Sequence, residues 1–240
     1  MKENAEKFIT TTLPYVNSKP HIGHTFEFVL ADIIARFHRD SKEVFFNVGI
    51  DEHGIKVQQA AEKAALPPQE YCDILANIWK DFCSKFQISY DNFYRTSSTE
   101  HKEKVLKFFE LINNPEYIYQ KEYVGHYCVG CETYITEKEI VDGKCPIHKT
   151  ELTQTKEVNW FFNLATFRDG IKNSLVDKKL TNELRNIVEN FDEISISRQN
   201  VDWGIKFDDK NTFYVWFEAL LNYVFAAGFL GSTDERENFE

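Results

Sequence analysis

Strand-like and helix-like patterns alternate through the first 112 residues, and this alternation restricts the fold more than any other feature of the sequence. Residues 8–13 predict a buried strand, and the apolar run at 43–50 predicts a second strand. Between them, apolar residues recur at helical spacing and predict a helix over 21–40. The other predicted elements are helices at 55–65, 68–86 and 100–111 and a short strand within 91–98. Such alternation favours βαβ units and a parallel sheet, in which ligands gather at the carboxyl ends of the strands.

The pattern changes after residue 112. Residues 113–160 predict short strands and turns without a long helical period, whereas residues 163–191 predict helix. Residues 212–217 then predict a strand and residues 218–230 a helix. We therefore expect three regions, at 1–112, 113–211 and 212–240.

Two ligand pairs lie in the middle region. Cys128-x-x-Cys131 and Cys145-x-x-His148 are separated by thirteen residues, and such pairs on tight turns present four soft ligands at tetrahedral separation. We expect a structural zinc site that holds together a small module at about 124–160. A catalytic zinc is less favoured because four protein ligands leave no open position. Unrelated thiols or a zinc ribbon that binds nucleic acid remain alternatives.

A histidine pair lies at the start of the predicted helix over 21–40. Pro20 suits the first helical turn, and His21 and His24 share one helix face next to the exposed N–H groups of the helix end. Gly23 removes a side chain and lets a flat ligand approach the backbone. The arrangement predicts a nucleoside triphosphate site in which the histidines stabilise charge that develops during attack at phosphorus. Two surface histidines near a helix cap are the alternative.

Five motifs, read in order, resemble the methionyl-tRNA synthetase family of class I aminoacyl-tRNA synthetases. They are "TLPYVNSKPHIGH", "VGIDEHG", "YCVGCETYITEKEI", "SISRQNVDWGI" and "FYVWFEALLNY", and the resemblance runs from Phe8 to about Gly231. It implies an α/β fold: the first half of a class I Rossmann-like nucleotide-binding domain over 1–112, a connective insertion with a zinc knuckle over 113–211, and a return to the catalytic domain over 212–240. It also implies ATP-dependent activation of L-methionine to methionyl-adenylate, with Mg²⁺ accompanying ATP, and transfer to tRNA(Met).

The resemblance assigns roles to individual residues. His21 and His24 would be catalytic and would bind ATP together with Gly23. Methionine would be bound by Leu13, Tyr15, Asp51, Trp216 and Tyr223, with Asp51 holding the ammonium group and the aromatic rings facing the thioether. Arg198 would support the active site, and Cys128, Cys131, Cys145 and His148 would hold structural zinc. A turn aspartate is the alternative for Asp51, and plain core packing is the alternative for Trp216.

The sequence departs from the family in two places. The family's KMSKS loop is not found in the sequence, and Glu218 occupies a position where the family pattern has Asp. We therefore expect an incomplete fragment with little activity alone, whose missing C-terminal half would be a separate chain if the enzyme is split. Alternative functions are a non-catalytic zinc-bearing relative or subunit, or another HIGH-type nucleotidyltransferase.

Charge and hydropathy exclude some classes. The formal net charge of −10 argues against a general electrostatic binder of nucleic acid, although a partner could dock on a local basic patch. No stretch approaches the roughly 20 apolar residues of a membrane span, and the N-terminus lacks the apolar segment of a signal peptide. We expect a cytoplasmic protein with no membrane partner.

Overall fold

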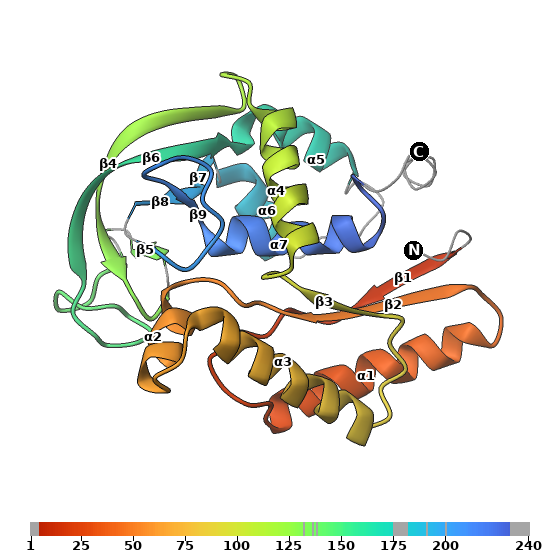
Figure 1. Cartoon of the computed structure of the whole chain (residues 1–240). Helices are drawn as coiled ribbons and strands as arrows, with labels where there is room; N and C mark the ends of the chain where they lie inside the picture. The colour runs from red at the N-terminus through yellow and green to blue at the C-terminus, as the bar shows by residue number, and fades with distance from the viewer. Residues whose placement is uncertain are drawn as a thin grey trace. The chain divides into compact units, whose positions relative to one another are not determined.

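The computed structural model of the chain describes residues 5–131, 133–135, 137, 139–174, 182–190, 192–199 and 201–230 (Figure 1). Parts of the predicted regions at 163–191 and 212–240, including Gly231, lie outside these residues. The chain divides into two compact units. Unit 1 comprises Met1–Leu106, Asp202–Ile205 and Val215–Glu240, and unit 2 comprises Lys107–Val201 and Lys206–Tyr214.

Unit 1 is built on a three-stranded parallel sheet. Its strands β1 (Lys7–Thr10), β2 (Val44–Ile50) and β3 (Asn92–Arg95) lie in the order β1-β2-β3. The helices in chain order are α1 (Ile22–Arg39), α2 (Ile55–Lys63), α3 (Pro68–Lys85), α4 (Thr99–Ile112, which continues into unit 2) and α7 (Val215–Ala226). The prediction of an α/β fold with a parallel sheet is confirmed.

The core of unit 1 lies between the sheet and the helices α1 and α3, which Figure 1 shows side by side against one face of the sheet. All seven residues of β2 are buried because β2 is the central strand. Alternate β2 side chains such as Phe46 and Val48 pack with Phe28 of α1 and Trp79 of α3. This close-packed core holds the carboxyl end of β2 in a fixed position.

Two sequence predictions, one in unit 1 and one at the border of the two units in the sequence, need correction. Residues 8–13 do not form a buried strand: β1 ends at Thr10 and is only partly buried, because it is an edge strand of the described sheet. Residues 212–217 do not form one strand, since α7 begins at Val215. Val215, Ala219 and Asn222 are buried at helical spacing. This packing overrides the strand preference of the aromatic and β-branched residues.

Unit 2 contains an antiparallel sheet with the order β5-β4-β6-β7. Its strands are β4 (Ile118–Cys128), β5 (Thr133–Ile135), β6 (Thr153–Asn163) and β7 (Glu193–Ser195), and a separate pair joins β8 (Ser197–Arg198) to β9 (Thr212–Phe213). Leu164–Phe167 forms a 3₁₀ turn followed by the helices α5 (Arg168–Ser174) and α6 (Asn182–Asn190), so the predicted helix is confirmed over 164–174 and 182–190, whereas Asn163 ends β6.

The prediction of only short strands in 113–160 is wrong, because β4 and β6 have 11 residues each. Their solvent-facing side is charged, as in the ion pair between Glu122 and Lys156, so no continuous apolar run marks either strand in the sequence.

Among the described residues, no helix has the length and apolar character needed to cross a membrane.

Candidate active site and metal centre

His21 and His24 cap the N-terminus of α1 and stack on one another, with ring centroids 3.8 Å apart. Nδ1 of His21, the N-cap residue, accepts a hydrogen bond from the Gly23 backbone N–H at 3.1 Å. Nδ1 of His24 accepts one from the His21 backbone N–H at 3.2 Å. The imidazoles thus form a reciprocal capping box, so both rings already face the N–H groups that an anion would approach.

Gly23 and Trp79 explain how this pair is held. A Cβ on Gly23 would lie 3.0 Å from the His21 ring, so a larger residue would displace the capping side chain. The His24 ring meets Trp79 edge-on at 4.8 Å. Burial lowers the pKa of His24, as does the neighbouring His21, against the opposing effect of Glu27. The neutral form of His24 is therefore favoured near pH 7, where its ring can accept a hydrogen bond.

Asp51 directly follows β2 and is 4% exposed. Its backbone N–H donates to the Pro14 carbonyl and its carbonyl accepts from the Val16 N–H, both at 2.9 Å. Its carboxylate oxygen Oδ1 lies 3.4 Å from the Thr96 hydroxyl. The backbone bonds join the carboxyl end of β2 to the loop before α1, which is the loop that carries Leu13 and Tyr15.

Tyr223 of α7 reaches the same loop. Burial raises its pKa and a hydrogen bond with the Leu13 backbone opposes that effect, while Glu27 and Asp51 raise the pKa further. The hydroxyl therefore stays protonated at neutral pH. The structure thus brings together Leu13, Tyr15, Asp51 and Tyr223.

Tyr15 and Trp216 are the other two aromatic residues that were predicted to bind methionine. The Tyr15 ring lies 5.5 Å from Nζ of Lys56. Trp216 lies on the first turn of α7, the helix that carries Tyr223, and is 52% exposed. Because half of its side chain is exposed, plain core packing does not account for Trp216.

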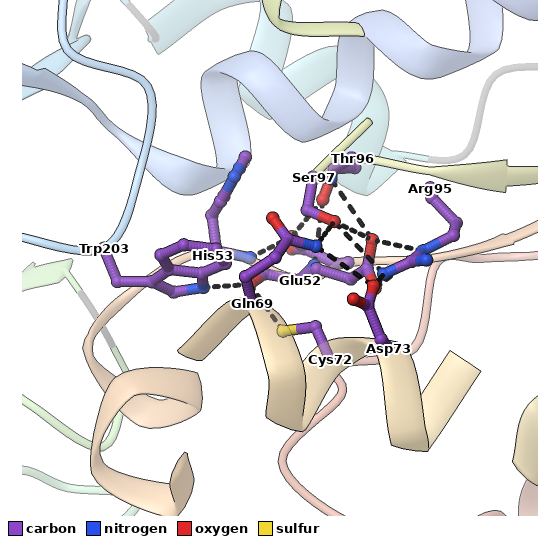
Figure 2. A network of polar contacts seen from close by, with 10 residues as sticks. Glu52, His53, Gln69, Cys72, Asp73, Arg95, Thr96, Ser97 and Trp203 are labelled. Atoms are coloured by element: carbon purple, nitrogen blue, oxygen red, sulfur yellow. Dashed lines mark hydrogen bonds and ion pairs between the residues drawn. The ribbon is translucent and has the colours of Figure 1, made fainter. Parts of the chain in front are cut away.

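Glu52 is a buried residue that sequence reasoning missed, and Figure 2 shows it at the centre of a polar network. Its Oε1 accepts hydrogen bonds from Nε and Nη2 of Arg95 at 3.0 and 2.7 Å, and its Oε2 accepts from the Ser97 hydroxyl at 2.7 Å. Trp203 Nε1 donates to the Glu52 carbonyl. Such charge-assisted bonds compensate the burial of the carboxylate and fix the backbone next to Asp51. The only signal in the sequence was a second acid after the strand end.

Glu27 is another residue that the sequence did not reveal. It lies on α1, and its carboxylate accepts from the Thr12 backbone N–H at 2.5 Å and from the Thr12 hydroxyl at 2.9 Å. These bonds attach the loop that carries Leu13 to the helix that carries the histidine pair.

Arg198 is 5% exposed and belongs to unit 2. Its guanidinium carbon lies 4.1 Å from the ring centroid of Tyr214 and 5.0 Å from that of Tyr134, and Nη1 donates to the Ser195 hydroxyl at 2.8 Å. These contacts give it a packing role inside unit 2. Its predicted role in support of the active site stays a prediction.

The cysteine and histidine pairs of unit 2 converge. One potential ligand atom from each of Cys128, Cys131, Cys145 and His148 lies within 4.8 Å of the others. The Cys131 and Cys145 sulfurs are 3.6 Å apart, and Nδ1 of His148 is 3.2 to 3.9 Å from the three sulfurs. A tetrahedron with Zn–S bonds of about 2.3 Å has ligand separations of about 3.8 Å. The four donors therefore fit a tetrahedral metal ion.

The local backbone explains this convergence. The Cys131 and His148 backbone N–H groups each donate to the sulfur three residues earlier, at 3.4 Å, which forms two matching turns. A Cβ on Gly130 would lie 2.6 Å from Cγ of His148, so only glycine lets the turns approach. Burial and the neighbouring sulfurs raise the pKa of Cys131 to about 12. Burial opposes ionisation of Cys145 too, yet hydrogen bonds from His148 lower the pKa of that thiol to about 6. A cation is needed for several of these sulfurs to be thiolates at once.

Comparisons with known proteins agree with one another. The family model described as class I (M) tRNA synthetases matches residues 7–158 and 147–240. A methionine–tRNA ligase of Caldanaerobacter subterraneus is 38% identical over 240 residues, which cover 95% of this chain and 38% of the relative. A methionine–tRNA ligase of Thermotoga maritima is 39% identical, over 96% of this chain and 39% of the relative.

A solved structure supports the same assignment. It is the Mycobacterium tuberculosis methionyl-tRNA synthetase in complex with methionyl-adenylate, which superposes with a TM-score of 0.86 at 33% identity. The match covers 96% of this chain and 48% of that chain. The present chain therefore spans less than half the length of these relatives.

Proposed function

The chain belongs to the family of class I (M) tRNA synthetases, and we propose that it carries the methionine-activating site of a methionine–tRNA ligase. In the proposed reaction a carboxylate oxygen of L-methionine attacks the α-phosphorus of ATP. The bond from that phosphorus to the leaving oxygen breaks, which yields methionyl-adenylate and pyrophosphate. A ribose hydroxyl at the 3′ end of tRNA(Met) then attacks the methionyl carbonyl, and AMP leaves. Family membership argues against a different HIGH-type nucleotidyltransferase.

The observation that carries the proposal is the meeting of Leu13, Asp51 and Tyr223 at the carboxyl end of β2. The Asp51 carboxylate can bind the ammonium group of methionine. The Tyr223 ring, held against the Leu13 backbone, can line a pocket for the methionine side chain. A neighbour of known structure binds methionyl-adenylate, which is the intermediate that this site would form.

His21 and His24 would act on the phosphates. Their rings lie at the N-terminus of an 18-residue helix, where N–H groups and the helix dipole favour negative charge. Because Nδ1 of each ring accepts a hydrogen bond from a backbone N–H, a neutral ring carries its proton on Nε2 and would donate from there to a phosphate oxygen. They would stabilise charge that develops on the phosphates without a covalent step. Mg²⁺ would neutralise part of the phosphate charge.

Zinc is the metal that we propose for the Cys128, Cys131, Cys145 and His148 cluster, because three thiolates and one imidazole at tetrahedral spacing are typical zinc ligands. It would supply folding free energy to the two turns and leave no position open for substrate.

That the C-terminal half of the ligase binds this chain as a separate partner stays a proposal, and two features of unit 1 support it. Along α1 the apolar side chains of Ile22, Phe26, Leu30, Ile33 and Phe37 are exposed, between 46% and 83%. Among the described residues, β1 pairs only with β2, so its other edge can accept a strand. A further α/β segment of the ligase would cover both features.

The direct test compares methionine binding by the chain and by Asp51→Asn in calorimetry. The loss of the charge-assisted bond to the ammonium should weaken methionine binding by about tenfold to hundredfold. The matched control is Asp81→Asn, which removes an exposed carboxylate on α3 and should change nothing. Equal affinities of the chain and of Asp51→Asn would contradict the proposed site. No methionine binding by a folded chain would favour a non-catalytic relative.

A further inference from the structure

Glu218 lies on the first turn of α7, and 1% of its surface is exposed. Its Oε1 is 2.8 Å from Nδ1 of His53, and its Oε2 is 2.6 Å from Nε2 of His101. His53 follows β2, and His101 lies on the first turn of α4. One buried carboxylate thus joins three separate segments of unit 1.

The hydrogen-bond pattern defines which atoms carry protons. Burial disfavours the carboxylate, but His53 and His101 outweigh that effect and lower the pKa of Glu218. An ionised carboxylate only accepts, so His53 Nδ1 and His101 Nε2 must both donate. His101 Nδ1 lies 3.0 Å from the Tyr94 hydroxyl and, in a neutral ring, accepts a hydrogen bond from it. The chain of bonds therefore runs from Tyr94 through His101 to Glu218, with His53 donating from the other side.

A buried carboxylate is a costly way to attach a helix. Apolar residues of similar volume often stabilise a fold as well or better, whereas hydrogen bonds between buried polar groups define one geometry. Both carboxylate oxygens of Glu218 are paired, although Nε2 of His53 has no hydrogen-bond partner among the described residues. Both histidines that contact Glu218 are buried. His53 is 1% exposed, and the His101 ring also packs on Phe225 of α7, with ring centroids 5.8 Å apart. The cluster is therefore suited to fix a position.

The position that it fixes is that of the proposed methionine site. His53 is two residues after Asp51, so its bond attaches α7 to the segment that carries Asp51. On the same helix Tyr223 bonds to the Leu13 backbone. Movement of α7 relative to β2 would change the Asp51 and Tyr223 spacing.

We propose that Glu218 is a positioning residue of the methionine site: by accepting from His53 and His101 it sets where α7 places Tyr223 relative to Asp51 and Leu13. The inference rests on the proposed function. Glu218 itself touches neither methionine nor ATP in this account.

The test uses two substitutions with opposite expectations. Glu218→Leu keeps the volume but leaves two buried N–H donors unpaired, and should weaken methionine binding by about tenfold to hundredfold with ATP binding unchanged. Glu218→Gln is the conservative variant. Its oxygen can accept from His53 and its amide can donate to His101, which then donates through Nδ1 to the Tyr94 oxygen. It should therefore restore most of the methionine affinity.

A ligand-independent measurement separates this inference from the proposed function. Hydrogen exchange of the Leu13 amide, which bonds Tyr223, should speed up in Glu218→Leu and return towards the original rate in Glu218→Gln. If the original chain binds no methionine, the proposed function fails while the Leu13 exchange still decides the role of Glu218.

Two results would overturn the inference: unchanged Leu13 exchange in Glu218→Leu, or equal losses of methionine and ATP affinity. Should Glu218→Leu fail to fold, the double variant Glu218→Gln with Tyr94→Phe replaces it. That variant removes the acceptor for His101 Nδ1–H, so its changes in methionine affinity and in Leu13 exchange should exceed the sum of the changes in the two single variants. Additive effects would overturn the inference.

Discussion

Individual carboxylates in unit 1 are held by neighbours far away in the sequence, and Asp32 of α1 shows the consequence most simply. It is 7% exposed, and its oxygens accept from Arg36 Nε at 2.6 Å and from the Ser89 N–H and hydroxyl at 2.7 and 2.6 Å. Burial alone would raise the pKa of Asp32, but these bonds outweigh burial and lower it.

A depressed pKa makes stability depend on pH in one direction. The contribution of Asp32 is present above the pKa of the unfolded chain, about 3.9, and is lost as the pH falls through the folded value. Asp32→Asn should lower the free energy of unfolding at pH 7 by about 1–3 kcal/mol, with a smaller effect towards pH 3. Urea denaturation at several pH values measures this. Asp40→Asn, an exposed change after the same helix, is the control. A loss independent of pH would contradict this account of Asp32.

Trp216 allows a second test at the residue scale. Because its side chain is 52% exposed, Trp216→Ala should leave the fold intact. Loss of a ring beside the thioether should weaken methionine binding by about tenfold and leave ATP binding unchanged. Calorimetry with both ligands checks this, with the exposed Phe37→Ala of α1 as the control. Equal losses for methionine and ATP would place Trp216 outside the pocket.

The sequence identified the residues with recognisable spacing. His21 and His24, Asp51 after a strand, and the Cys/His pairs are local patterns whose chemistry follows from a few neighbouring residues. Glu52 and Glu218 could not be recognised as buried, because their partners Arg95 and His101 are distant in the chain and only the fold brings them together.

At the scale of elements, periodicity predicted α1, α3 and α4 because each has an apolar face of sufficient length. It placed the start of α7 at 218 instead of Val215, since an aromatic and β-branched sequence fits a strand as well as a helix buried on several sides, but the predicted helix is confirmed over 218–226. It failed for the lengths of β4 and β6, where charged residues alternate with apolar ones.

The metal-binding turns give a prediction at this scale. In Gly130→Ala the added Cβ would overlap His148, so metal affinity and metal content should fall. Gly170→Ala is the matched control, because its Cβ would meet nothing within 4 Å, and it lies in helix α5, where alanine is favoured. Metal analysis of dialysed samples compares the two. Full metal content in Gly130→Ala would show that the turns adapt, against the geometry described here.

At the scale of the whole molecule, the residues proposed for methionine and ATP lie in unit 1, and the metal ligands lie in unit 2. We expected boundaries at 113 and 212 from the change of pattern, whereas contacts begin unit 2 at Lys107 and assign Asp202–Ile205 to unit 1. Unit 2 begins within helix α4, and the helical spacing of apolar residues does not reveal a unit boundary inside a continuous helix. Trp203 belongs to unit 1 through its bond to the Glu52 carbonyl.

The most direct test of the central claim is calorimetric binding of methionine and of a non-hydrolysable methionyl-adenylate analogue to the 240-residue chain, with zinc measured on the same sample. We predict that both ligands bind, the analogue more tightly, with about one zinc per chain. A folded, zinc-loaded chain that binds neither ligand would contradict a methionine site built from Leu13, Asp51 and Tyr223.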